Sequence, residues 1–335
     1  MPRETQTFLG FPFDSELFTQ LWTEEPDPKL TAMIESGAMV QDATIQARIQ
    51  NDGNLYTIPF YNILEGDPSN YDGQTDISVT PVGGKSQSGI VYGRSKGFVA
   101  RDFQGELSGS DPMGHIAATI GKYWQKQRQR ILIGITRALF ASTATNDYTL
   151  AFKEKHILNT GASIGVTDVN ELMVQALGDN KTAFSLAVMH SQVAKRLENL
   201  QVLEFWKQTL ASGVQLPMNI ASVNGLTAII DDSLTPTGTV YETFLFGTGS
   251  LRNATGRVDV PSESDRNPEK NGGQETLYTR LRETIHPNGF SFIVPEDNWT
   301  ESPTDPQLFS GDRWKAIYDP KSIAIAKLVT DESVI

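Results

Sequence analysis

The sequence predicts an α+β protein that combines one very long helix with strands spread along the chain. Three observations carry this prediction. Residues 111–144 show an apolar face at helical spacing, with no acid and no proline from residue 113 onward. Short apolar segments bounded by turn residues recur from residue 184 to the end. Residues 65–97 contain seven glycines, yet apolar residues recur among them at strand-like spacing.

The composition is that of a folded, acidic chain. It has 335 residues, of which 39% are hydrophobic and 20% charged, which excludes extensive disorder. Its 28 basic and 40 acidic residues give a formal net charge of −12. This balance argues against binding of free DNA or RNA, because phosphate contacts need an excess of lysine and arginine. The chain has no cysteine, which excludes disulfides, thiolate metal ligands and thiol nucleophiles.

The N-terminal region predicts an extended arm. It has no apolar run of signal-peptide length, and no window of the chain is apolar enough for a membrane span, so we expect neither. Residues 1–30 carry aromatic side chains, among them Phe11, Phe18 and Trp22, between prolines and acids. A segment so rich in proline cannot form its own core, so we expect it to dock on the chain's own body or on a neighbouring subunit.

Two β-hairpins are predicted before the long helix. In the first, weak alternation around Ile45 and Ile49 and again over residues 55–60 flanks an Asp-Gly turn signal. In the second, two strands within residues 65–97 would meet at a tip formed by Gly83 and Gly84. A hairpin of this kind has little core of its own and needs a partner surface to be stable.

The long helix is predicted to begin with Asp111 as its N-cap and Pro112 at its first position. About 30 residues at 1.5 Å each give a rod of roughly 45–50 Å. Its basic residues have no acids to balance them, and Lys122, Lys126 and Arg130 form one i, i+4, i+8 stripe. The stripe can pair with acids of the same subunit, with acids of a neighbouring subunit, or with an anionic polymer; the net charge favours the first two.

The region after this helix alternates helices and strands. A second helix is predicted over 167–178, with Asp168 as its cap, Glu171 at the capping-box position and Gly178 at its end. A third is predicted from about His190 to Leu210. Strands are expected at 184–189, 226–230, 241–247, 277–285, 289–294, 314–318 and 323–329, with an exposed polar loop at 259–275 and a Pro- and acid-rich excursion at 295–312.

One enzymatic motif is present. Gly161 to Gly165 match the Gly-x-Ser-x-Gly pattern around Ser163, and Asp231, Asp232 and His286 follow in the order found in serine hydrolases. A nucleophile elbow needs a strand running into the serine and a helix starting at it. Here the preceding strand signal is weak and the helix signal comes only after the second glycine. The hydrolase therefore remains an alternative, and we predict no catalytic residue.

The remaining motifs predict no cofactor and no metal. Gly84-Lys85-Ser86 resembles the end of a phosphate-binding loop but lacks the first glycine and a following helix. Gly247-Thr248-Gly249 lacks the third glycine of a dinucleotide fingerprint and is read as a turn. The acid pairs Asp231-Asp232 and Glu296-Asp297 could bind a hard cation, but adjacent acids are more often solvated turn residues.

The order of the segments resembles the major capsid proteins of tailed bacteriophages, which have the Hong Kong 97-like fold, in the branch with a separate scaffolding protein. The stretches that carry the resemblance are Ile34-Glu35-Ser36-Gly37 with Ile58-Pro59-Phe60, Asp111-Pro112-Met113 with Ile116-Ala117, Phe246-Gly247-Thr248-Gly249, and Glu283-Thr284-Ile285-His286-Pro287-Asn288-Gly289-Phe290-Ser291-Phe292.

The resemblance implies a shell of hexamers and pentamers that encloses double-stranded DNA, with no enzyme activity. It implies as partners further copies of the chain, a scaffolding protein, a portal protein, packaged DNA bound without sequence specificity and, in some cases, a decoration protein. The expected location is the virion, and the host cytoplasm during assembly. An encapsulin-like compartment shell, which shares the fold, is the structural alternative.

The resemblance also implies a division of the chain and a set of contact residues. The expected parts are an N-terminal arm (1–45), a peripheral domain (46–62, 99–166 and 286–318) with the long helix as its spine, an extended hairpin loop (63–98), an axial domain (167–285) and a C-terminal strand that returns to it (319–335). The candidates for assembly contacts are Phe11, Phe18, Trp22, Lys85, Arg94, Lys96, Lys122, Lys126, Arg130, Asp297 and Trp299.

Overall fold

The structure is a computed structural model that describes most of the chain. The described residues are 6–8, 11–13, 37–51, 53–61, 64, 66–71, 74, 76, 79–103, 112–209, 215–295 and 301–332; within them, the side chains of 6–8, 11–13, 50–51 and 204–220 are not described. Outside the main body, β1 (Gln6–Phe8) and β2 (Phe11–Phe13) form a small antiparallel pair. The predicted N-cap, Asp111, lies outside the described residues.

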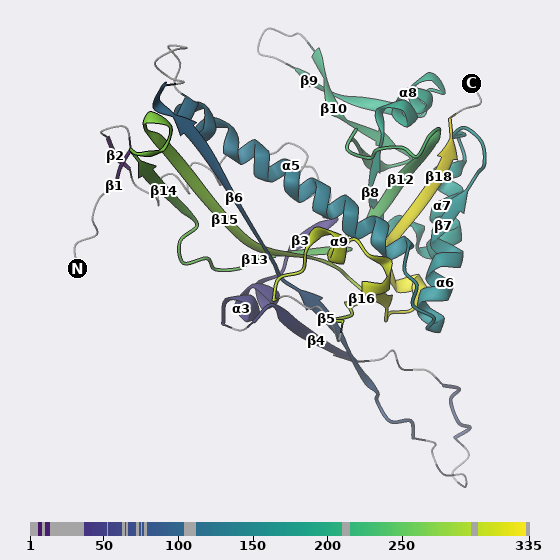
Figure 1. Ribbon diagram of the computed structural model, residues 1–335. Helices are drawn as coiled ribbons and strands as arrows, with labels where there is room; N and C mark the ends of the chain where they lie inside the picture. The colour runs from purple at the N-terminus through teal and green to yellow at the C-terminus, as the bar shows by residue number, and fades with distance from the viewer. Residues whose placement is uncertain are drawn as a thin grey trace.

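The long helix is confirmed as α5 (Pro112–Phe140), which has 29 residues and a length of about 43 Å. It runs alongside two long strands, β6 (Tyr92–Arg101) and β15 (Gln274–Pro287), as Figure 1 shows. The two strands are antiparallel partners, from Gln274 opposite Arg101 to Glu283 opposite Tyr92. The indole of Trp124 is buried against them and donates a hydrogen bond to the hydroxyl of Thr279, 3.2 Å away. The helix is therefore fixed to this sheet along its N-terminal half.

The sheet under α5 is completed by strands from three other parts of the chain. Its order is β14-β15-β13-β3, and β6 pairs with β15 beyond this path. The additional strands are β14 (Ser262–Asn267), β13 (Leu251–Thr255) and β3 (Met39–Gln41). Strand β14 lies inside the segment predicted to be an exposed polar loop, so that prediction was wrong. The polar composition of β14 is consistent with its position at the edge of the sheet, where one face and one side remain open to solvent.

A helix replaces the first strand of the first predicted hairpin. Residues 43–51 form α3 (Ala43–Asn51). The carboxylate of Asp42 accepts hydrogen bonds from the backbone N–H groups of Thr44 and Ile45, at 2.9 and 3.2 Å, and thereby caps the helix. Ile45 and Ile49 are both buried, as residues four apart on one helical face are. The spacing of these two isoleucines fits either a strand or a helix, and the N-cap at Asp42 favours the helix.

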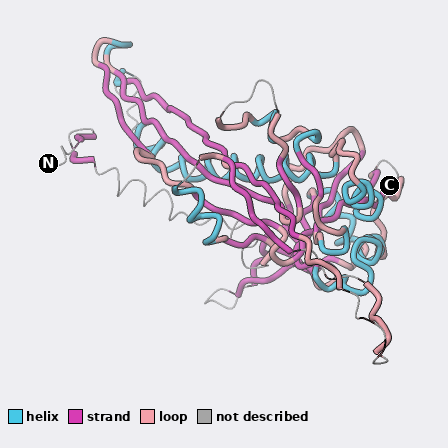
Figure 2. The backbone as a smooth tube through the Cα atoms, turned by 90° about the horizontal axis from the view of Figure 1, so that it is seen from below, coloured by secondary structure: helices cyan, strands magenta, loops and turns pink. Residues whose placement is uncertain are grey.

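The second predicted hairpin is built differently from the prediction. Strand β4 (Leu55–Tyr61) pairs with β5 (Gly84–Ile90), with Leu55 opposite Ile90 and Tyr61 opposite Gly84. Gly83 and Gly84 therefore lie at the start of a strand and not at a tip. The described residues between the two strands have no regular structure and extend away from the body of the molecule (Figures 1 and 2).

A second body contains a seven-stranded sheet in the order β7-β18-β12-β8-β11-β10-β9. Three helices, α6 (Asp147–His156), α7 (Asp168–Leu177) and α8 (Ser191–Asn199), belong to the same body (Figure 1). The strands are β7 (Ile157–Asn159), β18 (Ile325–Asp331), β12 (Val240–Gly247), β8 (Phe184–Met189), β11 (Leu226–Ile230), β10 (Gln215–Val223) and β9 (Leu203–Thr209). Strand β18 returns from the C-terminal end of the chain to lie beside β12.

Two details of the predicted helices in this body are corrected. The third helix ends at Asn199, and the residues predicted to continue it form strand β9. Gln201 has a φ of 59°, a left-handed conformation that helical backbone does not adopt, so the helix cannot continue through it. In α7, Asp168 is the first helical residue, and its carboxylate accepts the N–H of Gly165. Gly178 ends that helix with a φ of 61°, as predicted.

A third group of elements joins the two bodies. Strands β16 (Phe290–Phe292) and β17 (Trp314–Ala316) form a short antiparallel pair. Helix α9 (Asp305–Leu308), which lies between them in the sequence, packs beside α5. The indole of Trp314 is fully buried and donates to the carbonyl of Leu308 at 2.9 Å. Among the described residues, no helix combines the length and apolarity needed to cross a membrane.

Candidate assembly surfaces

The end of β4, at Tyr61, and the segment between β4 and β5 expose apolar side chains. Between 59% and 89% of each of these side chains is exposed; they are Tyr61, Leu64, Tyr71, Val79 and Val82. Isolated exposed apolar residues are ordinary, but five along one projecting segment are a typical mark of a protein interaction surface. Because the segment has no core, this surface is the strongest candidate for a contact with another chain. The sequence signal was the combination of apolar residues with many glycines.

Arg94 and Arg130, two predicted contact residues, share an acid of the same subunit. The Nε and Nη2 atoms of Arg94 donate to one carboxylate oxygen of Asp305, at 3.0 and 2.8 Å. The guanidinium of Arg130 lies 3.4 Å from the other oxygen. Arg130 is 61% exposed, so it remains accessible while it pairs. Asp305, which the sequence analysis did not single out, thus connects strand β6, helix α5 and the loop at α9.

Two further arginines of the long helix pair inside the subunit. Arg128 donates to Glu283 of β15 at 2.6 Å, and that carboxylate also accepts the hydroxyl of Tyr92 at 3.2 Å. Arg137 donates to Glu242 of β12 at 2.7 Å. Burial, and then the adjacent Glu283 carboxylate, raise the pKa of Tyr92, so its hydroxyl stays protonated and donates. Much of the cationic charge of the helix therefore binds the helix to both sheets of its own subunit.

Lys126 differs from these arginines. It is exposed and forms no ion pair with any residue that the structure describes. It lines an open groove between α5 and the end of β11, together with Arg130, Arg137, Asp231 and Asp232. Lys122, one turn earlier, is also exposed, but it already interacts with another group of the chain. Of the predicted stripe, Lys126 is the residue whose charge is most available to a neighbouring molecule.

The other predicted contact residues fall into two groups. The amine of Lys85 donates to the hydroxyl of Tyr148 at 3.0 Å and lies 4.4 Å from the centre of its ring, so Lys85 holds the hairpin to helix α6. Lys96 is exposed on β6. Phe18, Trp22, Asp297 and Trp299 lie outside the described residues, and for Phe11 the structure describes only its position in β2. The assignment of these residues to assembly contacts stays a prediction.

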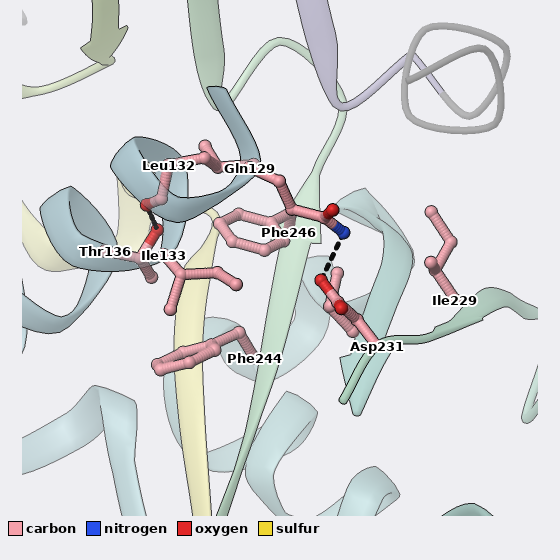
Figure 3. A pocket seen from close by; sticks show the side chains of 9 residues that line it. Gln129, Leu132, Ile133, Thr136, Ile229, Asp231, Phe244 and Phe246 are labelled. Atoms are coloured by element: carbon pink, nitrogen blue, oxygen red, sulfur yellow. Dashed lines mark hydrogen bonds between the residues drawn. The ribbon is translucent and has the colours of Figure 1, made fainter. Parts of the chain in front are cut away.

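The structure places the members of the hydrolase motif in different surroundings. The hydroxyl of Ser163 donates to the backbone carbonyl of Asp331 at 3.3 Å. The carboxylate of Asp231 accepts hydrogen bonds from the side-chain amide of Gln129 and from the N–H of Ser233, beside a cavity of about 20 Å³ (Figure 3). His286 is buried on β15, where its ring lies 5.9 Å from that of Tyr56. Among the described residues, no contact joins the serine to the imidazole.

The structure explains the two glycine motifs, and the acid pair Glu296-Asp297 lies outside the described residues. Gly84-Lys85-Ser86 begins strand β5, so it cannot form a loop ahead of a helix. Gly247 lies at the end of β12, where a β-carbon would come within 2.7 Å of the carbonyl oxygen of Ala183, and Gly249 has a φ of 68°. These glycines therefore serve a tight turn. Within the described ranges, no group of three or more potential ligands is placed to hold a metal ion.

Comparisons with known proteins identify relatives over nearly the whole chain. No family model matches it. The chain is 28% identical over 310 residues to the major capsid protein of Bacillus phage SPP1, which covers 89% of this chain and 90% of that protein.

Comparisons of the fold agree with the sequence relative. The capsid structure of Ralstonia phage GP4 has a TM-score of 0.56 at 11% identity and covers 89% of this chain and 88% of that one. The capsid subunit of cyanophage Pam1 has a TM-score of 0.56 at 10% identity, over 99% of both chains. A structure from Mycobacterium phage Bobi has a TM-score of 0.52 at 11% identity, over 90% of this chain and 91% of that one.

Proposed function

We propose, on the premise that this chain belongs to the major capsid proteins of tailed bacteriophages with the Hong Kong 97-like fold, that the hairpin segment and the exposed cations of α5 make the contacts between its copies. The protein is a structural subunit of the icosahedral virion shell and not an enzyme. The division into arm, hairpin loop, peripheral domain and axial domain is part of the same proposal.

The observation that carries the proposal is the exposure of apolar side chains on the segment between β4 and β5. At roughly 25 cal/mol per Å² of apolar surface, leaving such side chains in water forfeits burial energy that a second chain could supply. The same contact repeated around closed symmetry would be satisfied in every copy. The groove that contains Lys126 offers a second contact, to acids of a neighbouring subunit in a chain of net charge −12.

The further partners are proposed from the chemistry of the chain. An acidic protein can enclose packaged double-stranded DNA without adhering to it, because like charges repel. A scaffolding protein and a portal protein would guide and interrupt the lattice of identical subunits, and a decoration protein could add to its outside. The sequence relationship to a phage capsid protein favours this function over an encapsulin-like compartment.

The test is to remove the hairpin segment without disturbing its root. Tyr61 and Gly84 are partners at the end of the β4–β5 ladder, so an Asn-Gly turn can replace residues 62–83. The shortened chain should fold and remain unassembled when examined by electron microscopy and sedimentation. A second variant with a Gly/Ser segment of equal length separates the loss of apolar side chains from the loss of reach.

Closed shells from both variants would contradict the proposed role of the segment. An intact chain that stayed monomeric at every concentration, with scaffolding protein supplied, would contradict the assembly function itself.

A further inference from the structure

The root of the hairpin contacts strand β15 through several polar groups. Tyr56 of β4 and Gln87 of β5 are both buried; Tyr56 contacts Thr284 and His286 of β15, and Gln87 contacts the backbone at Gly289. The hydroxyl of Tyr56 lies 3.1 Å from that of Thr284, which in turn donates to the carbonyl of Ile90 at 2.6 Å. The ring of Tyr56 meets the ring of His286 edge-on. The hairpin is therefore seated by hydrogen bonds and ring contacts around one imidazole.

That imidazole is buried and unsatisfied. His286 is 1% exposed, and neither of its ring nitrogens has a hydrogen-bond partner among the described residues. The side-chain nitrogen of Gln87 and the side-chain oxygen of Asn288 are likewise buried without a partner, although Gln87 accepts the N–H of Gly289 through its oxygen at 3.1 Å. A neutral ring tolerates this environment at moderate cost, whereas an imidazolium needs an acceptor for each N–H.

Burial and the nearby Arg252 oppose the protonation of His286. Arg252 of β13 lies opposite His286 in the strand register, and its guanidinium donates to Asp42 at 3.0 Å. Tyr56 faces the ring from β4, and burial raises its pKa, so it stays neutral. Gln87, from β5, carries no charge. Burial first, and then the positive Arg252, lower the pKa of His286 to about 3, although the Asp42 carboxylate acts the other way.

We propose that the hairpin root is an acid-labile joint, in which protonation of His286 separates the β4–β5 pair from β15 while the seven-stranded sheet stays folded. The packing of Tyr56 leaves its ring little room to move away from His286 within the closed hairpin. The ring of Tyr56 lies directly over Gly89, where even a β-carbon would come within 2.2 Å of it. In the proposed joint, the imidazole gains water when the hairpin lifts. The inference concerns the subunit itself and is independent of shell formation.

The direction of the pH effect follows from linkage. A histidine in water titrates near pH 6.5, so the open form binds a proton below that pH while the closed form remains neutral down to about pH 3. The stability of the closed joint is therefore fully present above pH 6.5 and falls with acidification. The opening equilibrium should increase about tenfold per pH unit between these limits.

His156 provides a matched control elsewhere in the chain. It is also buried, it stacks on Phe152 with ring centres 4.7 Å apart, and burial lowers its pKa to about 4. Its Nδ1 lies 2.8 Å from the carbonyl of Ile325 on β18, so it belongs to the seven-stranded body and not to the hairpin root.

The test is amide hydrogen exchange of the intact chain at pH 6.5 and pH 4.5, corrected for the intrinsic rate. Residues 55–61 and 84–90 should exchange about fiftyfold faster at the lower pH, because half of the exposed imidazoles are already protonated at pH 6.5. His286→Gln should abolish this acceleration at the root, and His156→Gln should retain it. Persistence of the root acceleration in His286→Gln, or its loss in His156→Gln, would overturn the proposal.

A measurement on the wild type covers the case in which His286→Gln does not fold. Exchange of the imidazole C2 hydrogens, followed by mass spectrometry, reports the protonation of each of the four histidines. The pH dependence of the C2 exchange rate should show His286 protonated only at pH values where the amides of residues 55–61 and 84–90 also exchange. If His286 titrated near pH 6.5 while the amides of β4 and β5 stayed protected from exchange, the proposed coupling between protonation and opening would be refuted.

Discussion

Glu283 joins the long helix to the sheet beneath it, and neutralising it should destabilise the subunit measurably. Its side chain is 2% exposed, it accepts from Arg128 at 2.6 Å and from Tyr92 at 3.2 Å, and Arg128 is 29% exposed. Removing one partner of a fully buried ion pair costs about 3–5 kcal/mol. In Glu283→Gln the amide oxygen can still accept one hydrogen bond and Arg128 can turn to solvent. We therefore expect a loss of about 2 kcal/mol, or roughly thirtyfold in the folding equilibrium.

The neighbouring strand β14 offers a control with the same chemistry and little burial. Glu263 pairs with Arg280 at 3.0 Å, and the two side chains are 45% and 41% exposed. Exposed pairs are worth about 0.2–1 kcal/mol, so Glu263→Gln should have a small effect. Urea unfolding followed by tryptophan fluorescence compares both variants with the wild type, with Trp124 as a probe on α5. Equal costs for the two substitutions would refute the argument that burial makes Glu283 important.

Two further predictions follow from the structure. Gly311→Ala should destabilise the subunit by about 1–3 kcal/mol in thermal unfolding, because its β-carbon would come within 2.1 Å of the carbonyl oxygen of Ala141, whereas Gly53→Ala, which meets nothing within 4 Å, should not. Lys126→Glu should weaken assembly in sedimentation without changing the unfolding midpoint. Arg130→Glu should affect both, because it also loses the intrasubunit contact with Asp305; equal behaviour of the two variants would contradict this distinction.

The elements predicted correctly are those with a strong local signal. Helix α5 has an uninterrupted apolar face, and strands such as β8 and β12 are apolar runs between turn residues. These patterns arise from the burial of one face or of a whole element, and the spacing of apolar residues in the sequence shows them. The wrong predictions concern short segments for which two periodicities compete. Ile45 and Ile49 fit a strand or a helix equally well by spacing, and the sequence analysis did not weigh the cap at Asp42.

Pairings between distant strands could not be read from the sequence. Gly83 and Gly84 gave a turn signal, but Gly84 pairs with Tyr61, which lies more than twenty residues earlier in the chain. A local rule identifies the residues that favour a turn, and it contains no information about which distant strand completes a sheet. The acids Asp305, Glu283 and Glu242 were missed for the same reason, because each is far in sequence from the arginine that it binds.

These acids change the interpretation of the cationic helix. The sequence left the charge of α5 open to acids of the same subunit, acids of a neighbouring subunit or an anionic polymer. In the structure, Arg128, Arg130 and Arg137 each contact an acid of the same chain. Those ion pairs hold the helix to β15, to α9 and to β12 within the subunit. A cation that already has a partner can add little free energy to assembly without losing that partner. The intersubunit role on this helix therefore narrows to the positions that keep their charge available, of which Lys126 is the clearest.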